Sequence, residues 1–502
     1  MTAPRPQLVM VLVVDGLRPD FITAEETPTL WRLRSEGVFF SDSHAVFPTV
    51  TRVNAATLVT GAQPATHGIV GNEMYVPAVE PSRAFSTQDY RRLVRLDEVS
   101  GGRLLQVPTL AARLHAHGLR LAAVSSGSTG SAWLLDHRAA AGIGALVNGY
   151  FEAGRTVAYP ADLNAALLAK FGPAPAKPGG GEPYDAAVGW MLRVLREHVL
   201  PALAPSVVFA WLTEPDHSQH ALGVGAPSAR AAVGNADREI AALLETLEAL
   251  GLAATTDIVV ASDHGFTTNT AGVDVVGELV AAGLKASRAS DDVVLASSGQ
   301  AVGLHVRDRH PDRVARIVRF VQSREWGGVL FTAARAAGDP GGVVEGTFSL
   351  EMIHAANAER GVDVLVTFPW TSAASTLGVP GTDLANVNAG ATPYASDHGS
   401  MSPWNVRNTL LAWGPGFKSG TTVRTPAGNV DVTPTILALL GIAEREGLDG
   451  RVLSEALRDG PDAEQVAVER RVHTVATDGY RAALQVSVVD GRRYVDKSWR
   501  MR

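Results

Sequence analysis

Carboxylate and histidine side chains recur directly after apolar stretches of this sequence. The candidates are Asp15, Asp216 with His220, and the two triplets Asp263-His264-Gly265 and Asp397-His398-Gly399. Carboxylates and imidazoles are ligands that divalent metals such as zinc accept in proteins. The absence of cysteine excludes thiolate zinc sites and a cysteine nucleophile. Clusters of these two ligand types at several points of one chain predict a metal centre built from aspartate and histidine.

A hydroxyl that could act as a nucleophile lies in the segment Thr49-Val-Thr-Arg-Val-Asn54. The hydroxyl of Thr51 is a weak nucleophile at neutral pH until a base or a metal deprotonates it. Asp216 and His220 are four residues apart, so one helical face can present both as ligands. Each cluster alone has an ordinary interpretation, as a turn, a loop or a solvated helix face. Together they supply one hydroxyl and a full set of ligands for two metal ions.

The apolar stretches before these residues predict the elements that position them. Segments 8–14, 206–212 and 257–261 are runs dominated by apolar residues, of the kind buried in parallel sheets. Helical patterns at 107–114 and 235–247 lie between them. This alternation predicts the α/β class, with a doubly wound, mostly parallel central sheet and helices on both faces. Ligands gather at the carboxyl ends of the strands of such sheets, where the candidate residues lie.

A separate strand-helix-strand pattern interrupts this organisation. Its three elements are expected at residues 299–306, 311–323 and 327–331. We therefore predict a hydrolytic core in two parts, residues 1–290 and 392–502, with an inserted α+β cap domain at 291–391. No internal repeat is found.

The last part of the chain has the pattern of a β-hairpin. Residues 480–488 and 492–495 flank Asp490-Gly491, a dipeptide that favours the tight turn between two antiparallel strands. We expect this hairpin to complete the second part of the core.

Composition limits the partners. The 502 residues carry 44 Lys+Arg against 51 Asp+Glu, which gives no general basic surface for a nucleic-acid polymer. An anionic small-molecule substrate would instead be held locally by metal ions. The apolar run 8–14 is too short for a membrane span and has no basic leader, so we expect a cytoplasmic enzyme without membrane contact, provided that Met1 is the natural start. The oligomeric state stays open.

The ordered motifs resemble one known family. They are Asp15, Thr51 to Asn54, Thr60-Gly61, His67-Gly-Ile-Val-Gly-Asn72, Glu214-Pro-Asp216 with His220, the two Asp-His-Gly triplets, residues 412–417 and residues 431–435. This set is similar to the type I phosphodiesterase/nucleotide pyrophosphatases of the alkaline phosphatase superfamily. The resemblance spans most of the chain and is weakest in the cap and at 76–200. It implies an alkaline-phosphatase-like fold and metal-dependent hydrolysis of small phosphate esters.

The resemblance also implies a role for each matched residue. One metal would be held by Asp15, Thr51, Asp263 and His264, and the other by Asp216, His220 and His398. These ligand types suit zinc best, although manganese or iron would also accept them. Thr51 would attack phosphorus and form a phosphothreonine-type intermediate. Asn54 would donate a hydrogen bond to a non-bridging oxygen.

Two positions bear on substrate choice. Nucleotide-cleaving relatives carry an aromatic residue directly after the nucleophile and another five residues before the metal-binding aspartate. Here these positions are Arg52, a departure, and Trp211, which keeps a face for stacking. Arg52 could instead bind an additional anionic group. We assign Arg52, Trp211, Asn54 and Asn72 to substrate binding and leave nucleotide specificity open.

Other activities fit parts of the same pattern. The segment 50–54 also resembles phosphonoacetate-hydrolase-like enzymes, which cleave a C–P bond. Those enzymes are expected to use lysines near a strand that here ends at 125–130, where no lysine occurs, although Arg52 could substitute. A metal-dependent phosphomutase and a non-enzymatic metal-binding relative are further alternatives. A sulfatase is excluded because Thr51 cannot be converted to formylglycine.

Overall fold

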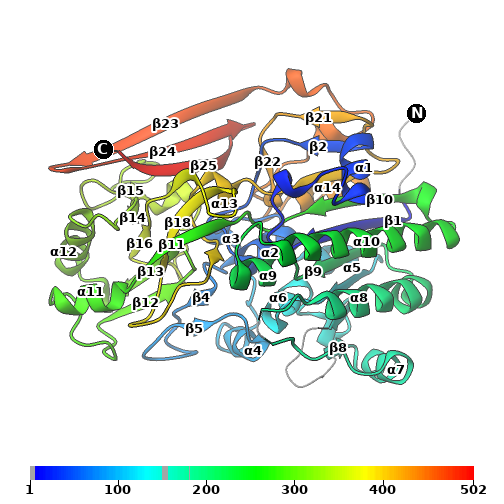
Figure 1. Ribbon diagram of the computed structural model, residues 1–502, viewed down its shortest axis with the longest axis horizontal. Coiled ribbons are helices and arrows are strands. Elements are labelled where there is room, and N and C mark those ends of the chain that lie inside the picture. The colour runs from blue at the N-terminus through cyan, green and yellow to red at the C-terminus, as the bar shows by residue number, and fades with distance from the viewer. Residues whose placement is uncertain (1–5, 150–156, 180, 502) are drawn as a thin grey trace.

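A nine-stranded mixed sheet forms the centre of the molecule (Figure 1). The computed structural model describes residues 6–149, 157–179 and 181–501, so the outermost ends of the predicted core lie outside the described residues. The strand order is β21 (Thr421–Val423), β2 (Val38–Phe40), β20 (Leu410–Trp413), β10 (Thr256–Ala261), β1 (Leu8–Val14), β9 (Val207–Leu212), β6 (Leu121–Ser125), β7 (Ala145–Asn148) and β8 (Val157–Tyr159). Strands β10, β1, β9, β6 and β7 are parallel, whereas β20 and β8 run antiparallel to their neighbours.

Strand β1 explains why this sheet needs helices on both faces. All seven of its residues are buried apolar side chains. Successive side chains of a strand point to opposite faces. Val9, Val11 and Val13 therefore pack into one apolar layer, and Met10 and Leu12 into the other.

Helices cover both layers, which confirms the predicted α/β class. One face is covered by α2 (Thr51–Thr60), α4 (Tyr90–Val99), α5 (Leu110–Ala116), α6 (Thr129–Leu135) and α14 (Val432–Leu439). The other is covered by α1 (Pro28–Glu36), α7 (Ala161–Phe171), α8 (Asp185–Val194), the π-helical segment Leu195–Leu203 and α10 (Pro227–Ala249). In the part of the chain that the structure describes, no helix combines the length and apolarity required to cross a membrane.

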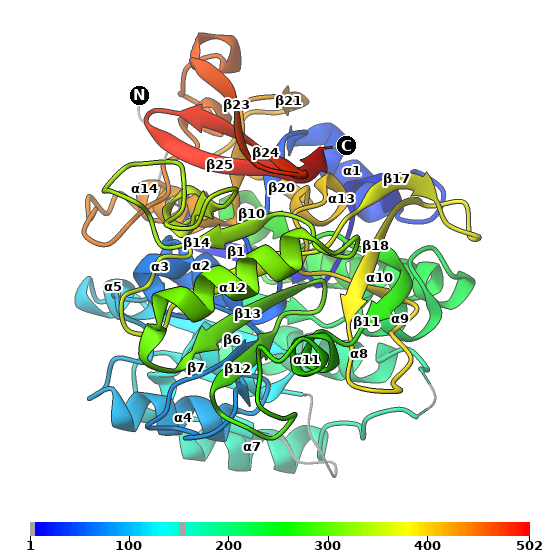
Figure 2. The same cartoon turned by 90° about the vertical axis from the view of Figure 1, so that its left-hand side faces the viewer.

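Two smaller sheets lie beside the central one. The five-stranded sheet has the order β12 (Val293–Ser297), β13 (Ala301–Val306), β16 (Val364–Thr367), β14 (Leu330–Thr332) and β15 (Phe348–Ser349). Figure 2 shows α12 (Pro311–Gln322) lying across it, with α11 (Val275–Ala281) nearby. The four-stranded sheet has the order β17 (Thr371–Ala374), β18 (Pro380–Asn386), β11 (Thr267–Val273) and β19 (Ser396–Asp397). Val275 and Leu279 pack into the apolar cluster of the five-stranded sheet, so this packing begins before residue 291.

A three-stranded antiparallel sheet ends the chain and lies along the upper edge of the molecule in Figure 1. It consists of β23 (Val468–Thr477), β24 (Tyr480–Val489) and β25 (Arg492–Met501). The turn between β24 and β25 is Asp490-Gly491, and both residues have positive φ, as a type I′ turn requires. The hydroxyl of Tyr494 donates to Asp431 Oδ2 over 2.9 Å, which attaches this sheet to the core.

Short elements complete the connections around the site. They are β3 (Ser43–His44) paired with β22 (Ala427–Gly428), β4 (Glu73–Met74) paired with β5 (Phe85–Ser86), and the helices α3 (Pro64–His67), α9 (Asp216–Leu222) and α13 (Pro403–Val406).

We expect Leu12→Ala to lower the free energy of unfolding by about 2–5 kcal/mol, because Leu12 is fully buried in the central strand and its loss leaves a cavity. Urea denaturation measures the change. Leu168→Ala, on the exposed side of α7, is the control and should change the free energy by less than about 0.5 kcal/mol. Equal effects would contradict the burial of Leu12.

Candidate active site

The neighbouring parallel strands β1 and β10 bring two aspartates together. Asp15 follows β1 directly, and Asp263 lies two residues after the end of β10. The backbone N–H of Gly16 donates to Asp263 Oδ1 over 3.0 Å, which closes the gap between the two strand ends. Gly16 has a φ of +71°, and a Cβ there would lie 2.9 Å from the Phe266 ring, so only glycine fits.

The third carboxylate comes from the start of α9, which follows β9. The backbone N–H of Asp216 donates to the carbonyl of Asp15 over 3.1 Å, so this helix begins against the end of β1. One turn later, His220 places its Nε2 3.4 Å from Asp216 Oδ1, as the four-residue spacing predicts.

Strand pairing joins the two Asp-His-Gly triplets. β11 begins just after the first triplet and pairs antiparallel with β19, which ends inside the second. As a result, the rings of His264 and His398 stack with their centroids 3.6 Å apart. Residues more than a hundred positions apart in the chain thus become neighbours in one site.

All three histidines are oriented by backbone carbonyl groups. His220 Nδ1 lies 3.1 Å from the Ser396 oxygen, His264 Nδ1 3.0 Å from that of Gly265, and His398 Nδ1 3.0 Å from that of Thr49. A carbonyl accepts only from an N–H, so each Nδ1 carries a proton and Nε2 is the ring nitrogen left to bind a metal. The three Nε2 atoms lie 3.4 Å (His220), 3.9 Å (His264) and 3.4 Å (His398) from Asp216 Oδ1.

The pKa values show strong electrostatic coupling in this cluster. Burial, together with repulsion by Asp263 and Asp216, raises the pKa of Asp15 well above its ordinary value. Burial alone would lower the pKa of His220, but the charge and hydrogen bond of Asp216 outweigh it and raise that pKa to about 9. Burial and the neighbouring His264 lower the pKa of His398 well below its ordinary range.

These side chains fit divalent metal ions. Asp15 Oδ1, Asp216 Oδ1 and Asp263 Oδ2 have no hydrogen-bond partner among the described residues, although each is buried. Buried carboxylate oxygens without partners are costly unless a cation approaches them. Two groups bring their ligand atoms within 4.8 Å of one another: Asp216, His220 and His398, and Asp15, Asp216 and His264. The first is the set predicted for one metal, and the second places Asp216 beside the ligands predicted for the other.

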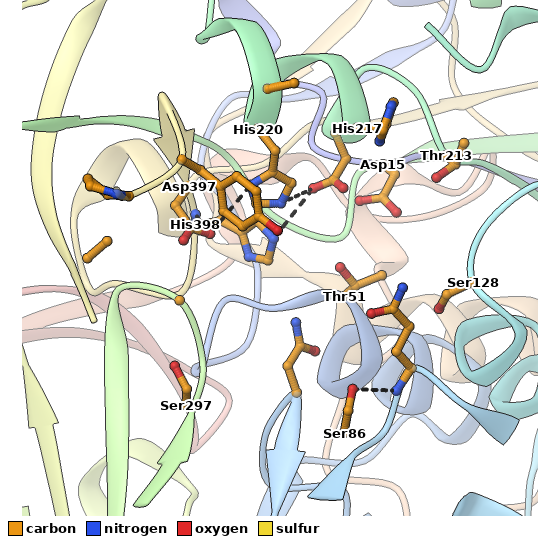
Figure 3. Close-up of a pocket in the computed structure, with 18 of the residues that line it drawn as sticks. Asp15, Thr51, Ser86, Ser128, Thr213, His217, His220, Ser297, Asp397 and His398 are labelled. Carbon is orange, nitrogen blue, oxygen red and sulfur yellow. Dashed lines mark hydrogen bonds and ion pairs between the residues drawn. The ribbon is translucent and has the colours of Figure 1, made fainter. Parts of the chain in front are cut away.

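Thr51 is the first residue of α2 and is almost fully buried. Its Oγ1 lies 3.4 Å from His264 Nε2, so the predicted nucleophile borders the cluster. Figure 3 shows Thr51 between Asp15 and His398 on one side and Ser86 and Ser128 on the other.

A cavity of about 770 Å³ opens beside Thr51. Its lining includes Asp15, Thr51, Asp216, His220 and His398, together with the predicted substrate residues Arg52 and Asn72. The Asn72 side-chain oxygen accepts from the backbone N–H of Arg52 over 3.2 Å. This bond fixes the Asn72 amide next to the nucleophile.

Asn54 does not occupy the position that the sequence predicts. It is fully buried, and it does not line the cavity. Its Oδ1 accepts from Val46 N and from Asn429 Nδ2, and its Nδ2 donates to the Val46 and Val50 carbonyls. Because these bonds occupy the whole amide, Asn54 supports the loop of the nucleophile instead of contacting substrate.

Trp211 also differs from its prediction. The side chain has no exposed surface and packs in the same apolar layer as Val207 and Phe209, from the same face of β9. Its indole N–H donates to Asp15 Oδ2 over 2.9 Å. An indole buried in this way offers no face to a substrate base, and its N–H holds the carboxylate of Asp15 instead.

Sequence reasoning missed much of the cavity wall. The lining also includes Ser86, Gln88, Ser128, Ser131, Lys177, Ser297 and Tyr394. These residues belong to strand ends, loops and helix starts without a recognisable motif. Of these residues, only Tyr394 could have been identified from the sequence, because it is an aromatic residue three positions before the second Asp-His-Gly triplet.

Together, the sheet and the carboxylate-histidine cluster at its strand ends define an alkaline-phosphatase-like α/β protein. The family model for type I phosphodiesterase / nucleotide pyrophosphatase matches residues 9–326. The chain belongs to this family, within the alkaline phosphatase superfamily.

Curated relatives match over shorter stretches. Bis(5'-adenosyl)-triphosphatase enpp4 of Xenopus laevis is 41% identical over 70 residues, which are 14% of this chain and 15% of the relative. Venom phosphodiesterase of Naja atra is 36% identical over 69 residues, 13% of this chain and 8% of the relative. Arylsulfatase K of Danio rerio is 35% identical over 83 residues, 14% of this chain and 16% of the relative. The matched stretches therefore span about one sixth or less of these relatives.

We expect Trp211→Phe to weaken the binding of zinc by on the order of tenfold, because it keeps most of the ring volume but removes the hydrogen bond that orients Asp15. Titration with a competing chelator measures the affinity. Trp190→Phe is the matched control, since the buried indole N–H of Trp190 has no hydrogen-bond partner among the described residues. Equal affinities in the two variants would show that the Trp211 bond does not matter.

Proposed function

We propose that this protein is a two-metal phosphoric-ester hydrolase that cleaves phosphodiesters, with Thr51 as nucleophile. One observation carries the proposal: three histidine Nε2 atoms converge on Oδ1 of Asp216 within 3.4 to 3.9 Å, and His264, one of the three, lies 3.4 Å from Thr51 Oγ1. Family membership supports it, as do the names of the relatives, a bis(5'-adenosyl)-triphosphatase and a venom phosphodiesterase.

Two sets of ligands account for the cluster. Asp15, Thr51, Asp263 and His264 would hold one divalent ion, and Asp216, His220 and His398 the other. Zinc suits these donors best, and manganese is also compatible with them. When bound, the ions supply positive charge that favours the Thr51 alkoxide and a negative leaving oxygen.

Hydrolysis takes place in two displacements. Thr51 Oγ1 forms a bond to phosphorus while the bond from phosphorus to the leaving oxygen breaks, and the threonine proton reaches the leaving alcohol through solvent. Water then forms a bond to phosphorus as the bond to Thr51 breaks, which restores the hydroxyl and releases a phosphate monoester. In-line transfer places the attacking and leaving oxygens on opposite sides of phosphorus.

Asn72 is the amide that can stabilise the reacting phosphoryl group. Its oxygen already accepts from Arg52 N, so its NH₂ group is left to donate to a non-bridging oxygen. Asn72 thereby takes the role first expected for Asn54, whose amide is fully used inside the protein.

A second candidate function follows from Arg52. Its half-buried side chain lines the cavity, and its Nε has no hydrogen-bond partner among the described residues. A guanidinium next to the nucleophile can bind a carboxylate in a bidentate manner. This favours a substrate with an additional anionic group, such as phosphonoacetate, as the alternative to a simple diester.

We also propose that residues 291–391 act as a cap over the substrate. Ser297, Gly299 and the stretch 385–388 line the cavity opposite the strand ends of the core. Residues of the cap would therefore help to select the ester while the core carries out the chemistry.

A substrate panel tests the proposed function. It consists of bis-p-nitrophenyl phosphate, p-nitrophenyl phosphate and phosphonoacetate, each assayed with zinc and with manganese. Cleavage of the diester that exceeds that of the monoester and is lost on chelation is expected. Preferred release of phosphate from phosphonoacetate would support the second candidate, and turnover that survives chelation would contradict a metal-dependent mechanism.

Thr51→Ala should lower the rate by more than about a hundredfold, a loss of about 2.7 kcal/mol in transition-state stabilisation, because no other group replaces the hydroxyl. Metal content should stay close to that of the wild type, since every carboxylate and imidazole ligand remains. Steady-state kinetics and elemental analysis measure both. Thr60→Ala, at a buried position of the same helix that does not line the cavity, is the control. Substantial residual turnover by Thr51→Ala would identify a different nucleophile.

Arg52→Phe should lower kcat/KM for a phosphate ester carrying an additional carboxylate by about tenfold, or about 1.4 kcal/mol, because it removes a charge-assisted contact. Cleavage of bis-p-nitrophenyl phosphate should change much less. Comparison of kcat/KM for the two esters measures the selectivity. A parallel loss for both would mean that Arg52 supports the nucleophile loop and does not contact the substrate.

A further inference from the structure

Tyr394 is an exposed aromatic residue inside the cavity. Nine large hydrophobic side chains of the described residues are exposed, and Tyr394 is the only one of them that lines the cavity. It is also the most exposed of the nine, with 63% of its surface accessible. An aromatic ring left in contact with water beside a reactive centre requires an explanation beyond packing.

The Tyr394 backbone is fixed in place. Its carbonyl accepts from Asn269 Nδ2 over 3.0 Å, and the next residue donates its backbone N–H to the His220 carbonyl over 3.1 Å. The phenol ring lies 5.0 Å from the imidazole of His220, at an angle of 51°. One part of the ring thus contacts a proposed metal ligand, while the rest faces the cavity.

Two other exposed hydrophobic residues are leucines that do not line the cavity. Leu222 is 39% exposed and Leu377 is 44% exposed. Both lie around the end of α9: a Cβ on Gly223 would lie 3.1 Å from Leu377 Cδ1 and 3.9 Å from the Ala395 Cβ. Tyr394 is therefore the exposed hydrophobic side chain that a bound substrate can reach.

We propose that Tyr394 forms a subsite for an aromatic leaving group. The inference rests on the proposed function, in which Thr51 attacks from the side of His264 and the leaving oxygen departs beside Asp216, His220 and His398. Tyr394 contacts His220, so its ring faces the departing group. The retained group stays on an equatorial oxygen of the reacting phosphorus, and we place it toward Arg52 and Asn72.

The subsite supplies an aromatic contact at a place in the cavity that differs from the two aromatic positions of nucleotide-cleaving relatives. The two aromatic positions of nucleotide-cleaving relatives are occupied here by Arg52 and by the buried Trp211, which leaves no stacking pair for the retained group. Tyr394 offers a ring to a planar alcohol such as a phenol or a nitrophenol, by offset or edge-to-face contact. The leaving group, and not the retained group, thus determines which esters this site prefers.

Two substrates with the same retained group test this subsite. Thymidine 5'-monophosphate p-nitrophenyl ester and thymidine triphosphate both transfer a thymidylyl group, but they release an aromatic alcohol and pyrophosphate, respectively. Tyr394→Ala should lower the ratio of kcat/KM for the aryl ester to that for the triphosphate by on the order of fivefold to tenfold. Tyr394→Phe, which keeps the ring, should retain the wild-type ratio. A ratio unchanged in Tyr394→Ala would overturn the proposal.

A binding measurement separates the subsite from the catalytic proposal. Fluorescence anisotropy follows the binding of 7-hydroxycoumarin, an aromatic leaving alcohol, to the metal-loaded protein without turnover. Wild type, Tyr394→Phe and Thr51→Ala should bind alike, and Tyr394→Ala should bind severalfold more weakly. Equal binding by Tyr394→Ala contradicts the subsite. A wild type that binds the coumarin but cleaves neither thymidylyl substrate contradicts the proposed function and leaves the subsite supported.

Discussion

Three aspartates with largely buried side chains share one corner of this fold, and their mutual repulsion is the constraint on which the site depends. Asp15, Asp216 and Asp263 each keep an oxygen without a hydrogen-bond partner among the described residues. Removing carboxylates from water costs several kcal/mol per ion unless positive charge compensates. The raised pKa of Asp15 shows the same conflict, since burial and its two neighbours disfavour its charged form. The divalent cations that we propose at this position would supply the compensating charge.

The fold holds the cluster rigidly through its backbone. Parallel strands β1 and β10 place two carboxylates at one sheet edge, and the start of α9 hydrogen-bonds to the end of β1. Three backbone carbonyls fix the protonated nitrogen of each histidine. Because these contacts use main-chain atoms, ligand orientation is tied to the sheet and does not depend on the surrounding side chains.

The residues proposed to carry out the reaction and the residues that surround the substrate come from different parts of the structure. The strand ends of the core and α2 carry Asp15, Asp263, His264 and Thr51, whereas much of the cavity wall comes from segments around residues 86, 128, 297 and 394. Such loops can change without moving the strand ends. In this chain the cavity wall carries an arginine directly after Thr51 and an exposed tyrosine beside His220.

The sequence alone determined the strands before the site and the spacing of Asp216 and His220, because apolar runs and helical spacing are local properties. The structure confirms the α/β class with its mostly parallel sheet. The tertiary structure decided the side-chain orientations that depend on residues distant in the sequence. The side-chain amide of Asn54 hydrogen-bonds to Asn429. The indole of Trp211 lies in the apolar layer on its face of β9, and its N–H donates to Asp15. Tyr394 enters the cavity only because β19 pairs with β11, a contact between segments more than a hundred residues apart that no local pattern encodes.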